Sequence, residues 1–251
     1  MQGEFPLLKP YYISEALPGN QTVQWSNDQV DSMLERLRQG EEIGAYHSCG
    51  ADLLKLVPHF PLGGRSVVVF GSQTPWVEAI ALNCNASSVT TFDYNRPICE
   101  DTRINTASMS ELARHRERYD VAISYSSLEH DGLGRYGDPL DPDGDFAAVA
   151  EVLHVLKPDG LVFFGVPISA TGGLEFNAHR VYNQHRFALL IQPLDYLGVV
   201  PFTADGSGAL ELGSGNDDWR HAAGVWETRP AGEASSDNQP WFVLRKPRAE
   251  P

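Results

Sequence analysis

Short apolar runs alternate along this chain with segments whose hydrophobic residues recur three and four positions apart. The apolar runs predict strands at 66–70, 89–92, 119–125, 161–166, 197–202 and 241–245. The helical spacing predicts helices at 27–38, 45–56, 110–118, 146–156 and 184–191, and another that begins near Trp76. Because strands and helices alternate through the middle of the chain, we expect an α/β fold with a mostly parallel sheet and helices on both faces.

Residue types at the ends of these elements predict several boundaries. Thr74 is placed to cap the helix that Pro75 opens, and Asp145 is placed to cap the helix at 146–156. The helix that begins at Ser110 lacks the acid of a capping box. The sequence Lys-Pro-Asp-Gly at 157–160 predicts a turn that ends the preceding helix.

The first buried strand begins only after a long N-terminal stretch. We therefore expect residues 1–62 to form a helical flank or cap and residues 63–251 to form one Rossmann-like domain. Within that domain, residues 205–238 hold many Gly, Ser, Asp and Asn residues, which predicts a long surface excursion.

The stretch from Ser66 to Asp93 has the pattern of a strand, a tight loop, a helix and a second strand that ends in an acid. The backbone amides at the start of such a helix point toward a ligand, and an acid at this strand end can bind both hydroxyls of a ribose. Gly71 is the only glycine of the loop, so the G-x-G-x-x-G pattern of NAD and FAD sites is not met. The loop favours an adenosine ligand without a pyrophosphate, such as S-adenosylmethionine; the alternative is a loop that binds nothing.

Ligands of an open α/β sheet bind at the carboxyl ends of its strands. This rule brings four loops to one crevice: 71–76, 93–95, 124–138 and 167–180. His130 is the candidate general base or substrate-orienting residue, with Glu129 or Asp131 fixing its tautomer; the alternative is a histidine that closes a strand end. Arg135 and Tyr136 form a clamp for a carboxylate or phosphate, or an ordinary surface pair.

Two further groups of residues allow two interpretations each. His179 and Arg180 either face the crevice or cap the next helix. Asp138, Asp141, Asp143 and Asp145 have the residue types of a calcium loop, but the spacing fits a polar turn better. We therefore expect no metal site, and a metal-assisted hydrolase built on His130 and these acids rests on residue types alone.

The charge of the chain limits its partners. Nineteen basic and thirty-three acidic residues leave a net charge of −14, which disfavours nucleic acid and anionic membranes. The three cysteines have no paired spacing, and no apolar run is long enough for a membrane span or a secretory signal. We expect a cytoplasmic protein with neither nucleic acid nor a membrane as partner.

Several segments carry a resemblance to a known family. FGSQTPW, TTFDY, YDVAISYSSLEH and LKPDGLVFFGVP are similar to the loop and strand motifs of class I methyltransferases. TPWVEA, SYSSLEHDGLGRYGDPLDPDGD and FNAHRVY resemble a methyltransferase-like family of unknown function first catalogued in nematode proteins. The resemblance implies the class I methyltransferase fold and transfer of a methyl group from S-adenosylmethionine to an oxygen or nitrogen of a small-molecule or sugar-like acceptor.

The loop departs from the glycine-rich form usual in that class, and the region at 105–108 lacks the acid that often contacts adenine. This departure leaves open a catalytically silent relative that binds a partner. The candidate catalytic residues are His130, Asp131 and His179. The candidate cofactor-binding residues are Gly71, Ser72, Gln73, Thr74, Pro75, Trp76, Asp93, Tyr94, Ser124 and Ser126. The candidate substrate-binding residues are Glu129, Arg135, Tyr136, Asp138 and Arg180.

Overall fold

The computed structural model describes residues 6–10, 23–46, 48–203, 205–213, 226 and 239–248. Within the expected excursion, residues 214–225 and 227–238 lie outside this part of the chain. An eight-stranded sheet has the order β12-β11-β13-β8-β7-β3-β4-β6. Its strands are β3 (Ser66–Phe70), β4 (Ser88–Asp93), β6 (Ile104–Ser108), β7 (Tyr119–Tyr125), β8 (Leu156–Gly165), β11 (Asp195–Val200), β12 (Glu211–Leu212) and β13 (Trp241–Arg245).

The expected mostly parallel sheet is confirmed. Strands β6, β4, β3, β7 and β8 run parallel, whereas β13, β11 and β12 complete the sheet in antiparallel pairs. The chain builds outward from β3 through β4 to β6, then returns to the other side of β3 with β7 and β8. This reversal between β3 and β7 creates the topological switch point where a doubly wound fold binds ligands.

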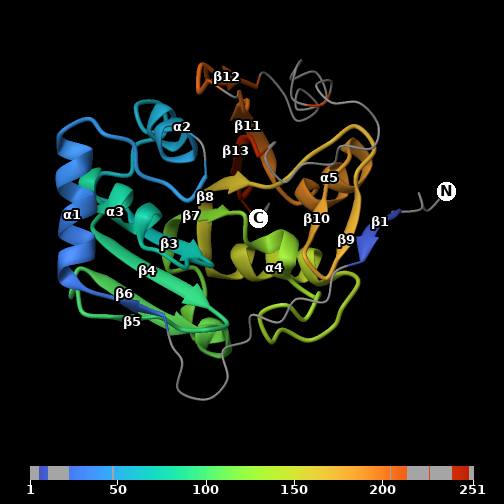
Figure 1. Cartoon of the computed structure of the whole chain (residues 1–251), viewed down its shortest axis with the longest axis horizontal. Helices are drawn as coiled ribbons and strands as arrows, with labels where there is room; N and C mark the ends of the chain where they lie inside the picture. The colour runs from blue at the N-terminus through green and yellow to red at the C-terminus, as the bar shows by residue number, and fades with distance from the viewer. Residues whose placement is uncertain are drawn as a thin grey trace.

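Helices cover both faces of the sheet, as expected (Figure 1). They are α1 (Asn27–Arg38), α2 (Cys49–Leu56), α3 (Trp76–Asn83), α4 (Gly144–Val155) and α5 (Gln184–Ile191), with 3-10 turns η1 (Met109–His115) and η2 (Leu128–His130). Successive residues of β3 point to opposite faces, so Val67 joins one core with α1, α2 and α3, while Val68 joins the other with α4 and α5. This double burial explains the uninterrupted apolar runs.

Helices α1 and α2, from the segment expected to form a flank, complete the core on one side of the sheet. Val30 of α1 and Leu53 of α2 are fully buried in the same cluster as Val67. The indole of Trp25 in β2 (Gln24–Trp25, paired with β5, Ile98–Cys99) donates a hydrogen bond to the carbonyl of Gln73 at 3.1 Å. The flank therefore supports the loop that follows β3.

The structure corrects the expected caps of three helical segments. Pro75 and Asp143, not Thr74 and Asp145, occupy the N-cap positions of α3 and α4. The helix expected at 110–118 is the 3-10 turn η1, which begins at Met109. Because of this earlier start, the acid of a capping box is present: Glu111 accepts a hydrogen bond from the amide of Ser108 at 2.9 Å.

The turn expected at 157–160 is also corrected. These residues lie inside β8, which begins directly after α4, instead of forming a separate turn. Asp159 within this stretch has a left-handed backbone conformation, with a φ of +61°. The local turn chemistry is therefore present, but the strand continues through it.

The segment expected as a loop at 167–180 contains two strands. β9 (Gly173–Phe176) and β10 (His179–Val181) pair antiparallel, and β1 (Leu7–Pro10) pairs parallel with β9. In Figure 1 this small sheet lies on the side of the molecule opposite α1. The hairpin places Ala178 and Arg180 against the loop that follows β7.

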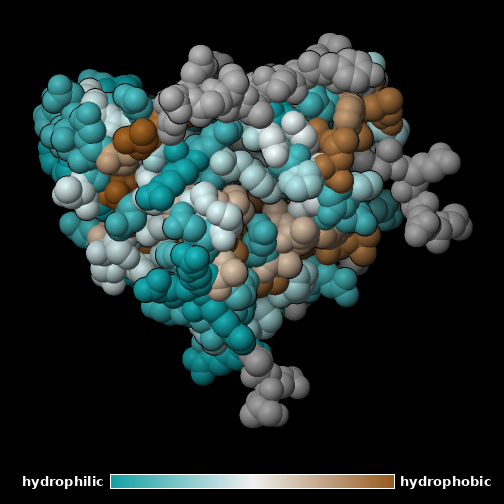
Figure 2. Space-filling view, turned by 90° about the horizontal axis from the view of Figure 1, so that it is seen from below, coloured by the Kyte–Doolittle hydropathy of each residue, from teal (hydrophilic) through white to brown (hydrophobic). Residues whose placement is uncertain are grey.

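No helix in the described part of the chain is long and apolar enough to cross a membrane. On the face shown in Figure 2, hydrophilic residues cover much of the visible surface and apolar residues form separate groups between them.

Candidate functional site

The loops after β3, β4 and β7 meet at the switch point of the sheet. Gly71 continues β3, and its amide donates a hydrogen bond to the carbonyl of Phe92 in β4 at 2.9 Å. Gly71 has a φ of +67°, and a Cβ at this position would lie 2.1 Å from Ser127 Oγ. A side chain is therefore excluded here on both conformational and steric grounds.

Asp93 ties the end of β4 to the 71–76 loop. Its Oδ2 accepts a hydrogen bond from the amide of Ser72 at 3.1 Å, and its Oδ1 accepts one from the amide of Asn95 at 2.7 Å. Burial raises the pKa of Asp93, while these two amides favour its charged form. Each carboxylate oxygen has a further lone pair, so both can still accept a hydrogen bond from a ligand.

The other residues of the 71–76 loop divide into exposed and buried members. Gln73 and Thr74 are exposed, whereas Ser72, Pro75 and Trp76 are buried. The ring of Trp76 packs edge-on against Tyr125, with the ring centroids 5.7 Å apart. Trp76 is therefore part of the wall behind the loop.

Tyr94 connects the end of β4 with the loop after β7. Tyr94 is 40% exposed, and its hydroxyl is hydrogen-bonded to the carboxyl of Asp131. Burial raises the pKa of Asp131 well above its usual range, and the nearby Asp138, Glu151 and Glu129 act in the same direction. Two predicted site residues from different loops thus meet at one hydrogen bond.

His130 lies beneath the surface of the same loop. Its Nδ1 lies 2.5 Å from the carbonyl oxygen of Ala178, so Nδ1 carries the proton and Nε2 presents its lone pair. Burial lowers the pKa of His130 to about 3, which leaves the ring neutral near pH 7. A group with so low a pKa is a weak general base at that pH.

Glu129 and His179 lie beside His130. Glu129 is fully buried, and its Oε1 is 3.6 Å from His130 Nε2. Burial raises the pKa of Glu129 to about 7. The rings of His130 and His179 are 6.1 Å apart between centroids, and burial together with the charge of Arg135 lowers the pKa of His179 to about 4.

Arg135, Tyr136 and Asp138 form the outer part of this loop. The guanidinium of Arg135 lies over the ring of Tyr136, 5.1 Å from its centroid, and donates to the carbonyl of Ala178 at 3.2 Å. Asp138 accepts hydrogen bonds from the amides of Gly134 at 2.8 Å and Tyr136 at 3.1 Å. Asp138 therefore shapes the turn that presents Arg135 and Tyr136.

Arg180 has contacts that differ from those expected of a substrate-binding residue. It is 2% exposed and donates to the backbone carbonyls of Glu129, Asp131, Asp141 and Pro142. Because these contacts occupy the guanidinium inside the protein, they support a role in holding the loop after β7 and not direct contact with a substrate.

Ser124 and Ser126 stand at the end of β7. The hydroxyl of Ser124 is buried and has no hydrogen-bond partner among the described residues. Ser126 has a φ of +50°, and its hydroxyl lies 3.4 Å from the hydroxyl of Tyr46 and from Nε2 of Gln239. Sequence reasoning missed Tyr46 and Gln239 because they come from the flank and from the segment before β13, far away in the chain.

Glu78 is another residue that sequence reasoning missed. It is fully buried in α3 and contacts Ser72 and Thr91 directly behind the 71–76 loop. The sequence feature that could have identified Glu78 is an acidic residue within an otherwise apolar helical segment.

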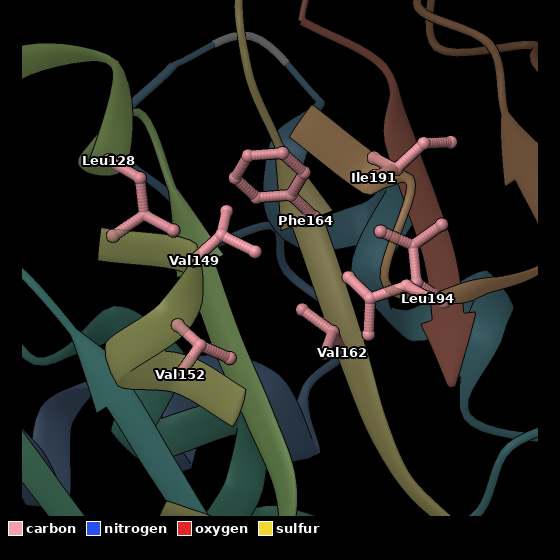
Figure 3. A pocket seen from close by; sticks show the side chains of 8 residues that line it. Leu128, Val149, Val152, Val162, Phe164, Ile191 and Leu194 are labelled. Atoms are coloured by element: carbon pink, nitrogen blue, oxygen red, sulfur yellow. The ribbon is translucent and has the colours of Figure 1, made fainter. Parts of the chain in front are cut away.

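A small cavity elsewhere in the core has an entirely apolar lining. Leu128, Val149, Val152, Val162, Phe164, Ile191, Leu194 and Leu244 line it. Figure 3 shows these side chains between α4, β8 and the segment after α5. This lining offers no polar group to orient a charged ligand, and the described residues include no group of three or more His, Cys, Asp or Glu that could hold a metal ion.

Comparison with solved structures supports the class of fold. The Burkholderia thailandensis 1,6-didemethyltoxoflavin-N1-methyltransferase, solved with S-adenosylhomocysteine, is 14% identical, with a TM-score of 0.54 and coverage of 87% of each chain. The [4+2]-cyclase SpnF is also 14% identical, with a TM-score of 0.50 and coverage of 88% of this chain and 95% of its own. The fold is that of Rossmann-like class I methyltransferases.

The chain belongs to the family described as "Caenorhabditis protein of unknown function, DUF268", which matches residues 64–224. The resemblance inferred from the sequence is thereby confirmed. A search of curated proteins found no match.

Proposed function

We propose that this protein binds S-adenosylmethionine at the switch point and transfers its methyl group to an oxygen or nitrogen of a small-molecule or sugar-like acceptor. The observation that carries the proposal is the convergence of Gly71, Asp93 and Ser124. The backbone at Gly71 allows close approach, Asp93 has free lone pairs for a ribose, and Ser124 offers a buried hydroxyl without a partner among the described residues.

When bound, the cofactor supplies an electrophilic methyl group. The chain would hold it with the 71–76 loop, Asp93, Tyr94 and the serines at the end of β7. Positioning of an acceptor beside it can contribute roughly 7–11 kcal/mol to the reaction. Arg135 and Tyr136 stand at the outer part of the loop after β7, where they can contact the acceptor.

Asp131 is the better candidate for proton removal from the acceptor. Its raised pKa makes its ionised form a stronger base than an ordinary aspartate, whereas His130 is neutral and weakly basic. We propose that His130, through its hydrogen bond to Ala178, positions the loop, and that His179 contributes to the same cluster.

Binding of S-adenosylhomocysteine to the Asp93→Asn variant, measured by calorimetry, tests the cofactor site. Loss of the charge should weaken binding by about 2 kcal/mol, or about thirtyfold in Kd. Asp120→Asn is the control because Asp120 contacts Ser66 at the opposite ends of the strands. An unchanged Kd in Asp93→Asn would contradict the assignment of Asp93.

Turnover tests the role of Asp131. With an acceptor found in a screen of amines and alcohols, Asp131→Asn should lower kcat by roughly 10²–10⁴-fold and leave the Kd of S-adenosylhomocysteine nearly unchanged. Full turnover in this variant would remove Asp131 from proton transfer.

The alternative function is a catalytically silent protein that uses the fold to bind a partner. The single glycine of the 71–76 loop favours it. Absence of binding of both S-adenosylmethionine and S-adenosylhomocysteine to the wild-type protein would make this alternative the preferred one.

A further inference from the structure

The 71–76 loop rests on a buried carboxyl group. Glu78 in α3 is fully buried, and its Oε1 accepts a hydrogen bond from Thr91 Oγ1 at 2.6 Å. Its Oε2 lies 3.2 Å from Ser72 Oγ. Ser72 is also held through its amide, which donates to Asp93. Glu78 thus contacts the same loop residue as Asp93, but from the interior.

The position of one proton decides the nature of this contact. Ser72 Oγ lies 2.9 Å from the carbonyl oxygen of Thr74, which can only accept a hydrogen bond. The hydroxyl of Ser72 has a single proton and lies within reach of two acceptors, and we assign the proton to the shorter contact, the one with Thr74. Ser72 Oγ then faces Glu78 as an acceptor, so the contact is a hydrogen bond only if Glu78 supplies the proton.

We propose that Glu78 is a positioning residue whose protonated carboxyl group holds the 71–76 loop in its ligand-binding shape. This inference rests on the proposed function for its consequence in cofactor binding. In this arrangement, Thr91 donates to Glu78, Glu78 donates to Ser72, and Ser72 donates to Thr74, so that every proton has an acceptor.

The surroundings of Glu78 favour the neutral form. Burial raises the pKa of Glu78 to about 7, and the charge of Asp93 acts in the same direction. The thiol of Cys99 is another titratable group that interacts with Glu78. Among the described residues, its carboxyl oxygens contact the hydroxyls of Ser72 and Thr91 and form no ion pair with a Lys, Arg or His. A neutral acid avoids the cost of an unpaired buried charge.

Two substitutions separate the protonated acid from an ionised one. Glu78→Gln replaces the acid with an amide that can still accept from Thr91 and donate to Ser72, whereas Glu78→Leu removes both contacts. We expect the Kd of S-adenosylhomocysteine to change by less than about threefold in Glu78→Gln and to rise by at least about tenfold in Glu78→Leu. Equal weakening in both variants would overturn the protonated assignment.

Hydrogen exchange provides a readout that does not require a cofactor. The hydrogen-bonded amides of Ser72 and Trp76 should exchange at least about tenfold faster in Glu78→Leu, with the wild-type rate retained in Glu78→Gln. Unchanged exchange in a folded Glu78→Leu variant would overturn the positioning role. If wild-type protein binds no cofactor while this exchange pattern is observed, the proposed function fails and the role of Glu78 in the loop stands.

Discussion

The carboxyl groups of this protein ionise according to the partners that surround them. Burial alone would raise the pKa of Asp120, but hydrogen bonds from Lys157 and Ser66 outweigh it and hold the pKa at about 2. Among the described residues, no Lys or Arg side chain donates a hydrogen bond to Glu78 or Glu129 as Lys157 does to Asp120. Burial raises the pKa of each of these two glutamates to about 7. Near pH 7 the carboxyl group of Asp120 is therefore fully ionised, whereas those of Glu78 and Glu129 are each only partly ionised.

The Asp120→Asn variant tests whether the ionised carboxylate of Asp120 stabilises the protein. Because the folded pKa lies below the usual value of 3.8, Asp120 stabilises the protein above about pH 4, and this contribution is lost as the pH falls toward 2. After allowance for partial exposure, we expect a loss of about 1 kcal/mol at pH 7 in urea denaturation. A loss that is the same at pH 7 and pH 2 would contradict this explanation.

His179 provides a second test, because the folded protein favours its neutral form, whereas it favours the charged form of Asp120. Its folded pKa of about 4 lies below the unfolded value of 6.5, so the unfolded chain binds more protons and stability falls as the pH is lowered from 6.5 to 4. The contribution is on the order of 3 kcal/mol.

His179→Gln should therefore flatten the acid side of the stability profile. Glu78 and Glu129 act with the opposite sign between about pH 4.5 and 7, so the variant is compared with wild type at each pH. His59→Gln, at an exposed position, is the control. If the stability of His179→Gln falls with decreasing pH as steeply as that of the wild type, protonation of His179 does not cause the decrease.

At the scale of elements, α4 and α5 are joined by a partly buried ion pair, in which Asp145 is buried and Arg186 is partly exposed. Arg186 donates to Asp145 at 2.6 and 3.0 Å, and the hydroxyl of Tyr182 donates to the same carboxylate at 3.1 Å. Asp145 is fully buried, which explains why it does not serve as the helix cap predicted from the sequence.

Removal of Asp145 should be costly. Asp145→Ala leaves the guanidinium of Arg186 without its carboxylate partner, and we expect a loss of roughly 3–5 kcal/mol in the free energy of unfolding. Asp143→Ala is the matched control because Asp143 is exposed and its side chain makes no capping hydrogen bond, so its effect should stay within about 0.5 kcal/mol. Similar losses of unfolding free energy in Asp145→Ala and Asp143→Ala would show that the ion pair with Arg186 does not stabilise the protein as proposed.

The elements that sequence patterns predicted well are those buried on a regular period. Uninterrupted apolar runs or helical spacing mark the elements with the expected bounds, which are β3, β7, α1, α5 and β13. The β9–β10 hairpin was missed because its strands are short, polar in part and begin at Gly173. The contacts of Arg180 are with residues far away in the chain, which no local pattern contains, whereas Glu78 had a local signal as an acid within an apolar helical segment.

At the scale of the whole molecule, the order of the strands decides where the candidate residues meet. The alternation of strands and helices predicted a mostly parallel sheet but not its strand order, and the reversal between β3 and β7 brings the loops after β3, β4 and β7 together. The flank at one face and the β9–β10 hairpin at the other support these loops through Trp25 and Ala178. The fold alone does not determine the reaction, since it hosts many activities.

Hydrogen exchange of the wild-type protein with and without saturating S-adenosylhomocysteine tests the central claim most directly, because it reports both binding and its location. We predict slower exchange in three separate segments at once, 71–76, 93–95 and 124–131, with little change at the opposite ends of the strands around Ser66 and Asp120. Protection elsewhere, or none at any concentration, would contradict a cofactor site at the switch point.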